Sequence, residues 1–323
     1  MQKYIIGIDV SKKTLDICAI FDGNIKKKSF TNTESGFKNL VAFTIKLQLS
    51  DPHFCMESTG CYSEDAAEFL HNSGFKVSLV NPLQIKSFRM SKMIRQKTDS
   101  SDAEVIANFC LQNDPSLWIP KPRENRELSE INGRLDSLKG ELNRLTNRLE
   151  KKTINIAVKA SIDEEIAFLK SRIKVLENEA KKLIEGDEKL RRDFALLTSI
   201  KGVGAKTALQ ILADMPNVNR FENAKQYAAF VGVTPFHRQS GTSVNGKSHI
   251  SRLGAKKIRK TLYMSSLVVK NHNQKFADFV KRLEKRGKCA KVIIVAIMRK
   301  LMHIFFGILK NGTPFDENLA FKT

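Results

Sequence analysis

Four carboxylates stand at positions where a folded chain could use them for chemistry. Asp9 follows one short apolar run and Glu57 follows another. Asp99 and Asp102 are three residues apart, a spacing that places both on one face of a helix. A carboxylate at the end of a buried strand needs a metal, another cation or water, because an unpaired buried charge is costly. Carboxylate oxygens suit hard divalent cations, so the four acids predict a site for two Mg²⁺ ions.

Two such ions can activate a nucleophile and stabilise the leaving oxygen in phosphodiester cleavage. The alternative is that the acids are solvated or cap helices, since acids in a first helical turn are favoured by the helix dipole. Asp16, Asp22 and Glu34 are interpreted in that way, as surface or turn residues. The order I-G-I-D-V-S, M-E-S-T-G and K-T-D-S-S-D-A favours the metal site for the other four.

The elements that must position these acids form a predicted α/β domain over residues 1–118. Strands are expected at 4–8, 14–21, 25–30, 53–56 and 76–80, with Asp22-Gly23 as a two-residue hairpin turn. Helices are expected from residue 33 or 35, over roughly 63–72, and from Asp99 to about Cys110. This order is typical of a ribonuclease H-like sheet. In it the strands before Asp9 and Glu57 are parallel neighbours, so both acids reach the same sheet end.

Residues 119–185 are predicted to form a helical arm. Apolar residues repeat every three or four positions from Leu128 to Leu149 and again from Ile162 to Leu183, which indicates two heptad seams. The pattern predicts two antiparallel coiled-coil helices joined near residues 152–160. Ser161 with Glu164 resembles a capping box and predicts the start of the second helix. The exposed seam could pair with a second chain or form a plain spacer.

Most of the net positive charge lies in residues 186–323, which are predicted to form a third, mostly helical domain. The formal net charge of the chain is +21 with a pI near 9.8, and this part alone has 26 Lys and Arg against 9 Asp and Glu. Such an excess indicates a polyanionic partner, most often nucleic acid. Lys201, Gly202, Gly204 and Lys206 have the form of a helix-hairpin-helix turn, in which glycines let the backbone approach a phosphate.

A polar segment over residues 235–251 is predicted to be a long loop, followed by a basic helix over 255–269. Ser240-Gly241 could present a hydroxyl to a phosphodiester, although such pairs are usually turns and three other serines compete: Ser243, Ser248 and Ser251. The cations expected to contact nucleic acid here are Arg238, Lys247, Lys256, Lys257, Arg259 and Lys260.

Two further features of the sequence indicate the cellular compartment. The apolar run 292–309 is interrupted by Arg299, Lys300 and His303, which favours a buried helix over a membrane span. The five cysteines include no C-x-x-C pair, so we expect reduced thiols, no zinc site and a cytoplasmic protein.

Taken together, these motifs resemble the DEDD insertion-sequence transposases, which include the Piv-type DNA invertases. The resemblance rests on I-D-V-S-K, M-E-S-T-G, T-D-S-S-D-A, G-V-G-x-K-T-A and R-Q-S-G with the basic residues after it. It implies a RuvC-like domain, a coiled-coil arm and a second domain with an essential serine. By position, Asp9, Glu57, Asp99 and Asp102 match the metal-binding acids, and Ser240 matches a serine that joins DNA as a phosphoserine.

The resemblance also implies a structured noncoding RNA that pairs with donor and target DNA, and a dimer of dimers that shares its active sites between subunits. One alternative is a RuvC-like endonuclease that cuts branched DNA with water. Another is a non-enzymatic nucleic-acid-binding protein whose acids only cap and pair. In an RNA-guided system base pairing carries the specificity, so the target sequence is not encoded in the protein.

Overall fold

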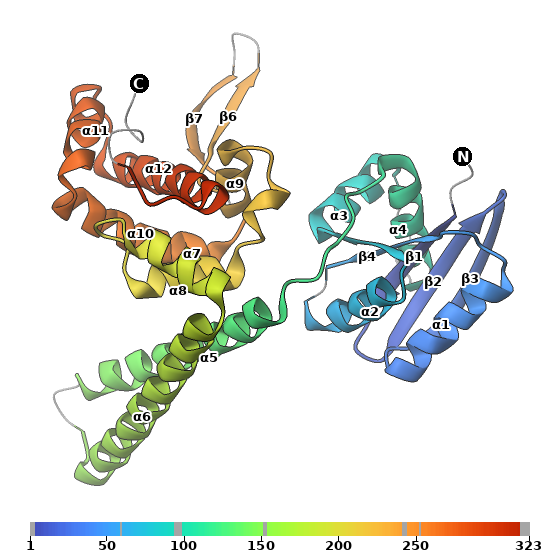
Figure 1. The fold of residues 1–323 in the computed structure, drawn as a ribbon, viewed down its shortest axis with the longest axis horizontal. Coiled ribbons are helices and arrows are strands. Elements are labelled where there is room, and N and C mark those ends of the chain that lie inside the picture. Colours follow the sequence, from blue (N-terminus) through green and yellow to red (C-terminus); the bar gives the residue numbers. More distant parts are fainter. Residues whose placement is uncertain are drawn as a thin grey trace. The chain divides into compact units, whose positions relative to one another are not determined.

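The computed structural model of the protein describes residues 4–58, 60–93, 99–150, 154–240, 244–251 and 253–316, without side-chain detail at 61, 99, 100, 237–240 and 244–248. The chain forms two compact units, Met1–Pro120 and Lys121–Thr323 (Figure 1). Each unit has its own apolar core. The boundary expected near residue 185 stays a prediction, because it lies inside the second unit.

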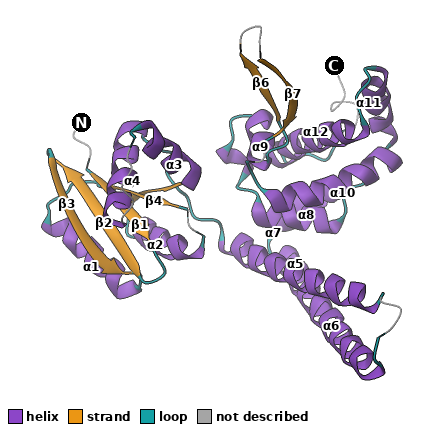
Figure 2. Ribbon diagram, turned by 180° about the vertical axis from the view of Figure 1, so that it is seen from behind, coloured by secondary structure: helices purple, strands orange, loops and turns teal. Residues whose placement is uncertain are grey.

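A five-stranded mixed sheet forms the centre of the first unit (Figure 2). Its order is β3-β2-β1-β4-β5, with parallel pairing of β1 with β4 and of β4 with β5. Asp22 and Gly23 join β2 to β3 with φ values of 48° and 76°, as a type I′ hairpin requires. The mixed α/β sheet is therefore confirmed, and its order is consistent with a ribonuclease H-like domain. The strands are β1 (Ile5–Val10), β2 (Thr14–Phe21), β3 (Asn24–Thr31), β4 (His53–Glu57) and β5 (Lys76–Val80).

Helices cover both faces of this sheet (Figure 1). Side chains alternate along β1, as extended backbone requires. Ile6 and Ile8 pack with α1 and α2, whereas Ile5 packs with α3 and α4. By the same alternation Gly7 and Asp9 face α3 and α4. These helices are α1 (Glu34–Lys46), α2 (Cys61–Asn72), α3 (Pro82–Ser91) and α4 (Asp99–Asn113).

Helix α3 is an addition to the predicted elements. Asn81 and Pro82 directly follow β5, and the Asn81 side chain accepts a hydrogen bond from Leu83 N at 2.9 Å and caps a helix. Pro82 follows at the first helical position, where its missing N–H costs no hydrogen bond. The pair therefore ends one element and begins the next.

Gly7 marks the closest approach of β1 and α4. A Cβ at this position would lie 2.3 Å from the Ala103 carbonyl oxygen and 2.4 Å from the Ala107 amide nitrogen. Both are backbone atoms, so the helix would have to move. We expect Gly7→Ala to lower the free energy of unfolding of the first unit by about 1–3 kcal/mol, the usual cost of overpacking. Urea unfolding followed by circular dichroism measures this change.

Gly140 in α5 (Arg123–Leu149) provides the matched control. Nothing lies within 4 Å of a Cβ built there, so the same substitution removes only backbone freedom. Gly140→Ala should stabilise the chain by about 0.5–1 kcal/mol, as expected inside an exposed helix. Wild-type stability of Gly7→Ala would show that α4 does not pack on β1 in this way.

The second unit begins with a hairpin of two long helices, α5 and α6 (Ile156–Gly186). Leu135 and Leu138 of α5 pack with Leu169 and Ile173 of α6 in one buried cluster. The two predicted helices are thus present, while their supercoiling stays a prediction. The predicted start at Ser161 is wrong: the Asn155 side chain caps α6 by accepting from Ala157 N at 2.9 Å, and Ser161 lies inside the helix.

The rest of the second unit is mostly helical and carries one β-hairpin. The expected loop over 235–251 instead forms the antiparallel strands β6 and β7, apart from residues 241–243, which lie outside the described part. Its polar residues lack the apolar alternation that predicts a strand. The elements are α7 (Glu188–Thr198), α8 (Ala205–Asp214), η1 (Val218–Arg220), α9 (Ala224–Val231), β6 (Pro235–Ser240), β7 (Val244–Ile250), α10 (Lys256–His272), α11 (Gln274–Lys285) and α12 (Ala290–Asn311).

Helix α12 supplies much of the core of this unit. Ile297, Leu301 and Phe305 are fully buried there, one helical turn apart. Among the described residues, α12 is the one helix long and apolar enough to cross a membrane by length and composition, and half of that stretch is buried inside the unit. Its apolar character therefore has an explanation in packing.

Candidate functional site

Asp9 and Glu57 lie at one end and on one face of the sheet. β1 extends to Val10, two residues beyond its predicted end, so Asp9 belongs to the strand. Ile8 pairs with Met56 in parallel register, which places the two acids one residue further along neighbouring strands. Gly7 contacts α4, and Cys55 belongs to the apolar cluster that includes α3 and α4. Asp9 and Glu57 each follow one of these residues by two positions, so both acids lie on the α3–α4 face of the sheet. Both acids are half-buried.

The first turn of α4 reaches the same region. Ala103 contacts Gly7, and Asp102 directly precedes it. The Asp102 carboxylate forms an ion pair with Arg89 of α3, and the two side chains are 18% and 17% exposed. Arg89 was not singled out from the sequence, because nothing local distinguishes it from the other basic residues of a basic chain. The charge of Arg89 neutralises that of Asp102 and so reduces the repulsion among the acids on this face of the sheet.

Asp16 is a second residue that the sequence interpretation missed. Its sequence context indicates a surface or turn role, but it lies within β2 directly opposite Asp9 in the antiparallel register. It is half-buried and two residues from Cys18, which packs on the α3–α4 face. Like charges opposite one another destabilise a sheet unless a cation lies between them. Counting the register outward from the Ser11–Lys13 turn would have identified this pair.

The donor chemistry of this region fits Mg²⁺. Among the described residues no group of three or more His, Cys, Asp or Glu side chains is close enough to hold a metal ion, and the Asp99 side chain lies outside them. Mg²⁺ nevertheless usually keeps several waters and takes only one or two protein carboxylates, so it does not need a closed cage. The strand register brings Asp9 and Glu57 to one end of the sheet, and the α4 contact at Gly7 puts the helix that carries Asp102 on the same face.

Ser240 ends β6 in the second unit. Its backbone pairs with Val244 of β7, and Arg238 pairs with Gly246 on the same hairpin. Lys247 follows on β7. The side chains of Ser240, Arg238 and Lys247 lie outside the described residues. The hairpin projects from the helices of its unit (Figure 1), which places the end that bears Ser240 away from the apolar core.

A basic groove lies between the α7–α8 turn and α10. Gly202 has φ 101°, and a Cβ there would lie 2.6 Å from Val269 Cγ2, so glycine permits both the turn and the close packing. The groove has a volume of about 600 Å³, and its lining includes the exposed apolar residues Met264 and Val268. Five predicted nucleic-acid-binding residues line it, namely Gly202, Gly204, Lys206, Lys257 and Lys260, together with one acid, Asp136.

Other predicted cations are not part of this groove. Lys201 and Lys256 are exposed but do not line it. The guanidinium of Arg259 donates to the carbonyl oxygens of Val231 at 2.8 Å and Leu253 at 3.2 Å. Arg259 therefore ties the end of α9 to the segment before α10, a structural role.

Comparison with known proteins places these features in one family. A DEDD-type transposase family model matches residues 6–153, and the model described as "Transposase IS116/IS110/IS902 family" matches residues 194–281. The chain is 34% identical over 322 residues to the pilin gene-inverting protein of Moraxella bovis, with 99% of each chain covered. It belongs to the IS110 transposase family.

Other members of the IS110 family match along most of the chain. The pilin gene-inverting protein of Moraxella lacunata is also 34% identical, with 99% of each chain covered. The transposase of the insertion sequence element IS1111A from Coxiella burnetii is 24% identical over 322 residues, covering 88% of this chain and 84% of that protein. The first family match spans Asp9, Glu57, Asp99 and Asp102, whereas the second spans Ser240 and every groove residue except Asp136.

If the groove of this IS110-family protein holds a phosphate backbone, its lysines must set the salt dependence of binding. Each phosphate contact contributes about 0.9 to the slope of log K against log salt concentration. We therefore expect Lys206→Gln and Lys260→Gln each to weaken DNA or RNA binding and to reduce the slope by about 1. Fluorescence anisotropy titrations between 50 and 300 mM KCl measure it.

Lys170→Gln is the control, because this lysine is exposed on α6, away from the groove. It should leave the slope unchanged. Equal effects of all three variants would mean that binding depends on net charge rather than on the groove.

Proposed function

We propose that this chain is the transposase or recombinase of an insertion sequence, which cuts and rejoins DNA with metal-bound carboxylates and a serine nucleophile. The observation that carries the proposal is the placement of Asp9 and Glu57 on one face and at one end of the sheet, in a chain related over 99% of its length to a gene-inverting protein. An acid pair at that place is costly for packing alone.

Asp9, Glu57, Asp99 and Asp102 would hold two Mg²⁺ ions. Bound there, the ions would supply Lewis acidity to the phosphodiester and lower the pKa of the attacking hydroxyl. The protein's own contribution is to fix the oxygen donors on strands and on the first turn of α4, which Gly7 allows to approach β1. Arg89 orients the Asp102 carboxylate from α3.

Ser240 would be the nucleophile. A serine hydroxyl is weak at its free pKa and needs activation, which the carboxylate-bound metal would provide. Attack of Oγ on phosphorus forms one P–O bond as the bond to the leaving strand end breaks, so the energy of the phosphodiester is conserved for rejoining. Arg238 and Lys247, on the same hairpin, are suited to hold the flanking phosphates.

The partners would be donor DNA, target DNA and a guide-type noncoding RNA. The basic groove and the helix-hairpin-helix turn would grip phosphates without reading sequence. The α5–α6 hairpin would act as a coiled-coil arm between subunits of a dimer or tetramer. Acids of one subunit would then meet the serine of another.

The test is purification of the full chain, sequencing of the RNA that copurifies, and a cleavage assay on donor and target DNA. We expect an enriched structured RNA and strand cleavage that requires Mg²⁺, stops with EDTA and leaves protein bound to DNA on a denaturing gel. Cleavage without a protein adduct would favour a water-using endonuclease. Tight binding without cleavage under any metal condition would favour an architectural protein.

A further inference from the structure

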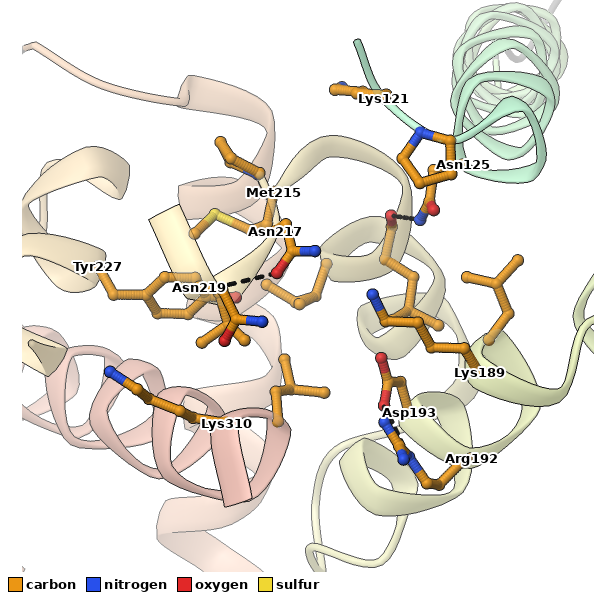
Figure 3. Close-up of a pocket in the computed structure, with 17 residues that line it drawn as sticks. Lys121, Asn125, Lys189, Arg192, Asp193, Met215, Asn217, Asn219, Tyr227 and Lys310 are labelled. Carbon is orange, nitrogen blue, oxygen red and sulfur yellow. Dashed lines mark hydrogen bonds and ion pairs between the residues drawn. The ribbon is translucent and has the colours of Figure 1, made fainter. Parts of the chain in front are cut away.

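A second cavity of the second unit has a different chemistry from the groove. It lies between α7, the end of α8, the 3₁₀ turn η1, α9 and the end of α12, and has a volume of about 190 Å³ (Figure 3). This is below the roughly 300 Å³ at which pockets for drug-sized ligands begin, so it suits one small planar group. None of its lining residues belongs to the acids or the serine discussed above.

The inner wall carries a buried carboxylate and a buried phenol. The Asp193 side chain is 11% exposed, and both of its contacts, from Arg192 Nη2 at 3.3 Å and Nε at 3.4 Å, reach the single oxygen Oδ1. Burial raises the pKa of Asp193 above its usual value. Tyr227 is 1% exposed, and burial followed by the charge of Asp193 raises the pKa of its hydroxyl, which therefore stays protonated as a donor.

The entrance is positively charged. Lys189, Arg192, Lys310 and Lys121 are all exposed and line the cavity, with Asn217 and Asn219 beside them. Figure 3 shows Asp193 and Tyr227 facing the cavity from different elements, with Lys189 and Lys310 around them. A ligand that fits both parts must present hydrogen-bond donors inside and negative charge outside.

We propose that this cavity binds one unstacked guanine nucleotide of a single-stranded nucleic acid, with Asp193 accepting hydrogen bonds from the base and Lys189, Arg192 and Lys310 holding the flanking phosphates. The proposal rests on the nucleic-acid binding proposed above and adds a base-reading site to it. Guanine alone among the common bases presents two adjacent donors, N1–H and the N2 amino group, beside an acceptor, O6. An ionised carboxylate and a phenol O–H are the complement of that edge.

The Tyr227 ring is not the stacking platform. Its centroid lies 5.1 Å from that of Phe221 and 5.8 Å from that of Phe306, so aromatic neighbours already pack around it. Its hydroxyl is therefore the part left for recognition. Met215, Ile211 and Leu190 provide the apolar contacts on which a base could rest. Adenine, cytosine and uracil each present at most one donor group to the carboxylate, so we expect guanine to bind more tightly than these three bases.

The test uses the full chain and labelled hexanucleotides with one variable base in a uracil background. Replacing guanine by inosine removes only the N2 amino group. We expect inosine to bind about tenfold more weakly or worse, the discrimination that one bidentate contact provides. Asp193→Asn should abolish this preference, so that the guanine and inosine oligonucleotides bind the variant equally. Asp163→Asn, an exposed acid on α6, should behave as the wild type. Deoxyribose versions separate RNA from DNA as the source.

Equal affinity of the wild-type chain for guanine and inosine overturns the proposal without any variant, so a misfolded Asp193→Asn protein cannot obscure the result. A preserved guanine preference in a folded Asp193→Asn chain overturns the role of Asp193. Loss of binding to every oligonucleotide at low salt would instead contradict the proposed nucleic-acid function itself.

Discussion

Replacement of Asp9 by Asn should abolish strand cleavage and recombination while the protein stays folded. Even changes in the outer shell of a metal site cost about 10–100-fold, so loss of a direct ligand should cost more than about 100-fold in rate. Stability should not fall, because Asn relieves repulsion between Asp9 and Asp16 across β1 and β2. A Mg²⁺-dependent cleavage assay with thermal unfolding of the same samples measures both quantities. Binding of RNA and DNA should be nearly unchanged.

Asp16→Asn is the matched comparison, because it removes the same charge from the neighbouring strand. Asp16 is not among the four proposed ligands. The smallest usual loss on changing a residue around the ligands of a metal is about tenfold, so this variant should keep more than about a tenth of the wild-type cleavage rate. A loss as severe as that of Asp9→Asn would show that the four-acid set is incomplete. Wild-type cleavage by the Asp9→Asn protein would contradict the proposed metal site.

Replacement of Ser240 by Ala should eliminate the covalent protein–DNA adduct and recombination together. Removal of a catalytic nucleophile costs on the order of 10⁴-fold or more, because no other group can take over the covalent step. The hairpin should persist, since Ser240 contributes its backbone to the β6–β7 pairing and alanine preserves it. Recombination between donor and target plasmids, with denaturing gels for the adduct, gives both readouts.

The competing serines provide the controls. Ser243→Ala, Ser248→Ala and Ser251→Ala should each keep recombination within a few-fold of wild type. Ser251 Oγ accepts a hydrogen bond from Leu253 N at 3.1 Å, so its variant also tests whether a local structural change alone is harmful. Recombination by Ser240→Ala, or its loss in one of the other three, would reassign the nucleophile.

The sheet of the first unit could be predicted because its signals are local. Apolar runs and the Asp22-Gly23 turn give strands within two residues of those observed. The ribonuclease H-like strand order makes the strands before Asp9 and Glu57 parallel neighbours, and this predicts that both acids lie at one end of the sheet. The family resemblance was confirmed by relatives that cover the whole chain.

Features that depend on tertiary contacts could not be predicted. The Asp102–Arg89 ion pair joins α4 to α3, and no local signal indicates which of the many basic residues meets this acid. The polar β6–β7 hairpin has no apolar alternation, so its sequence predicts a loop rather than two strands. Ser161 fits a capping pattern, but Asn155, six residues earlier, can also cap a helix and is the residue that does so. Ile162 is buried within this longer helix.

The most direct measurement is mass-spectrometric identification of the residue that carries DNA after reaction with Mg²⁺. The wild-type chain with its copurified RNA is incubated with donor and target DNA, denatured, and digested with protease and nuclease. The account predicts a nucleotide-bearing phosphoserine at Ser240, absent with EDTA and absent from the Asp9→Asn protein. An adduct on another residue, or efficient strand exchange with no adduct at any time, would contradict it.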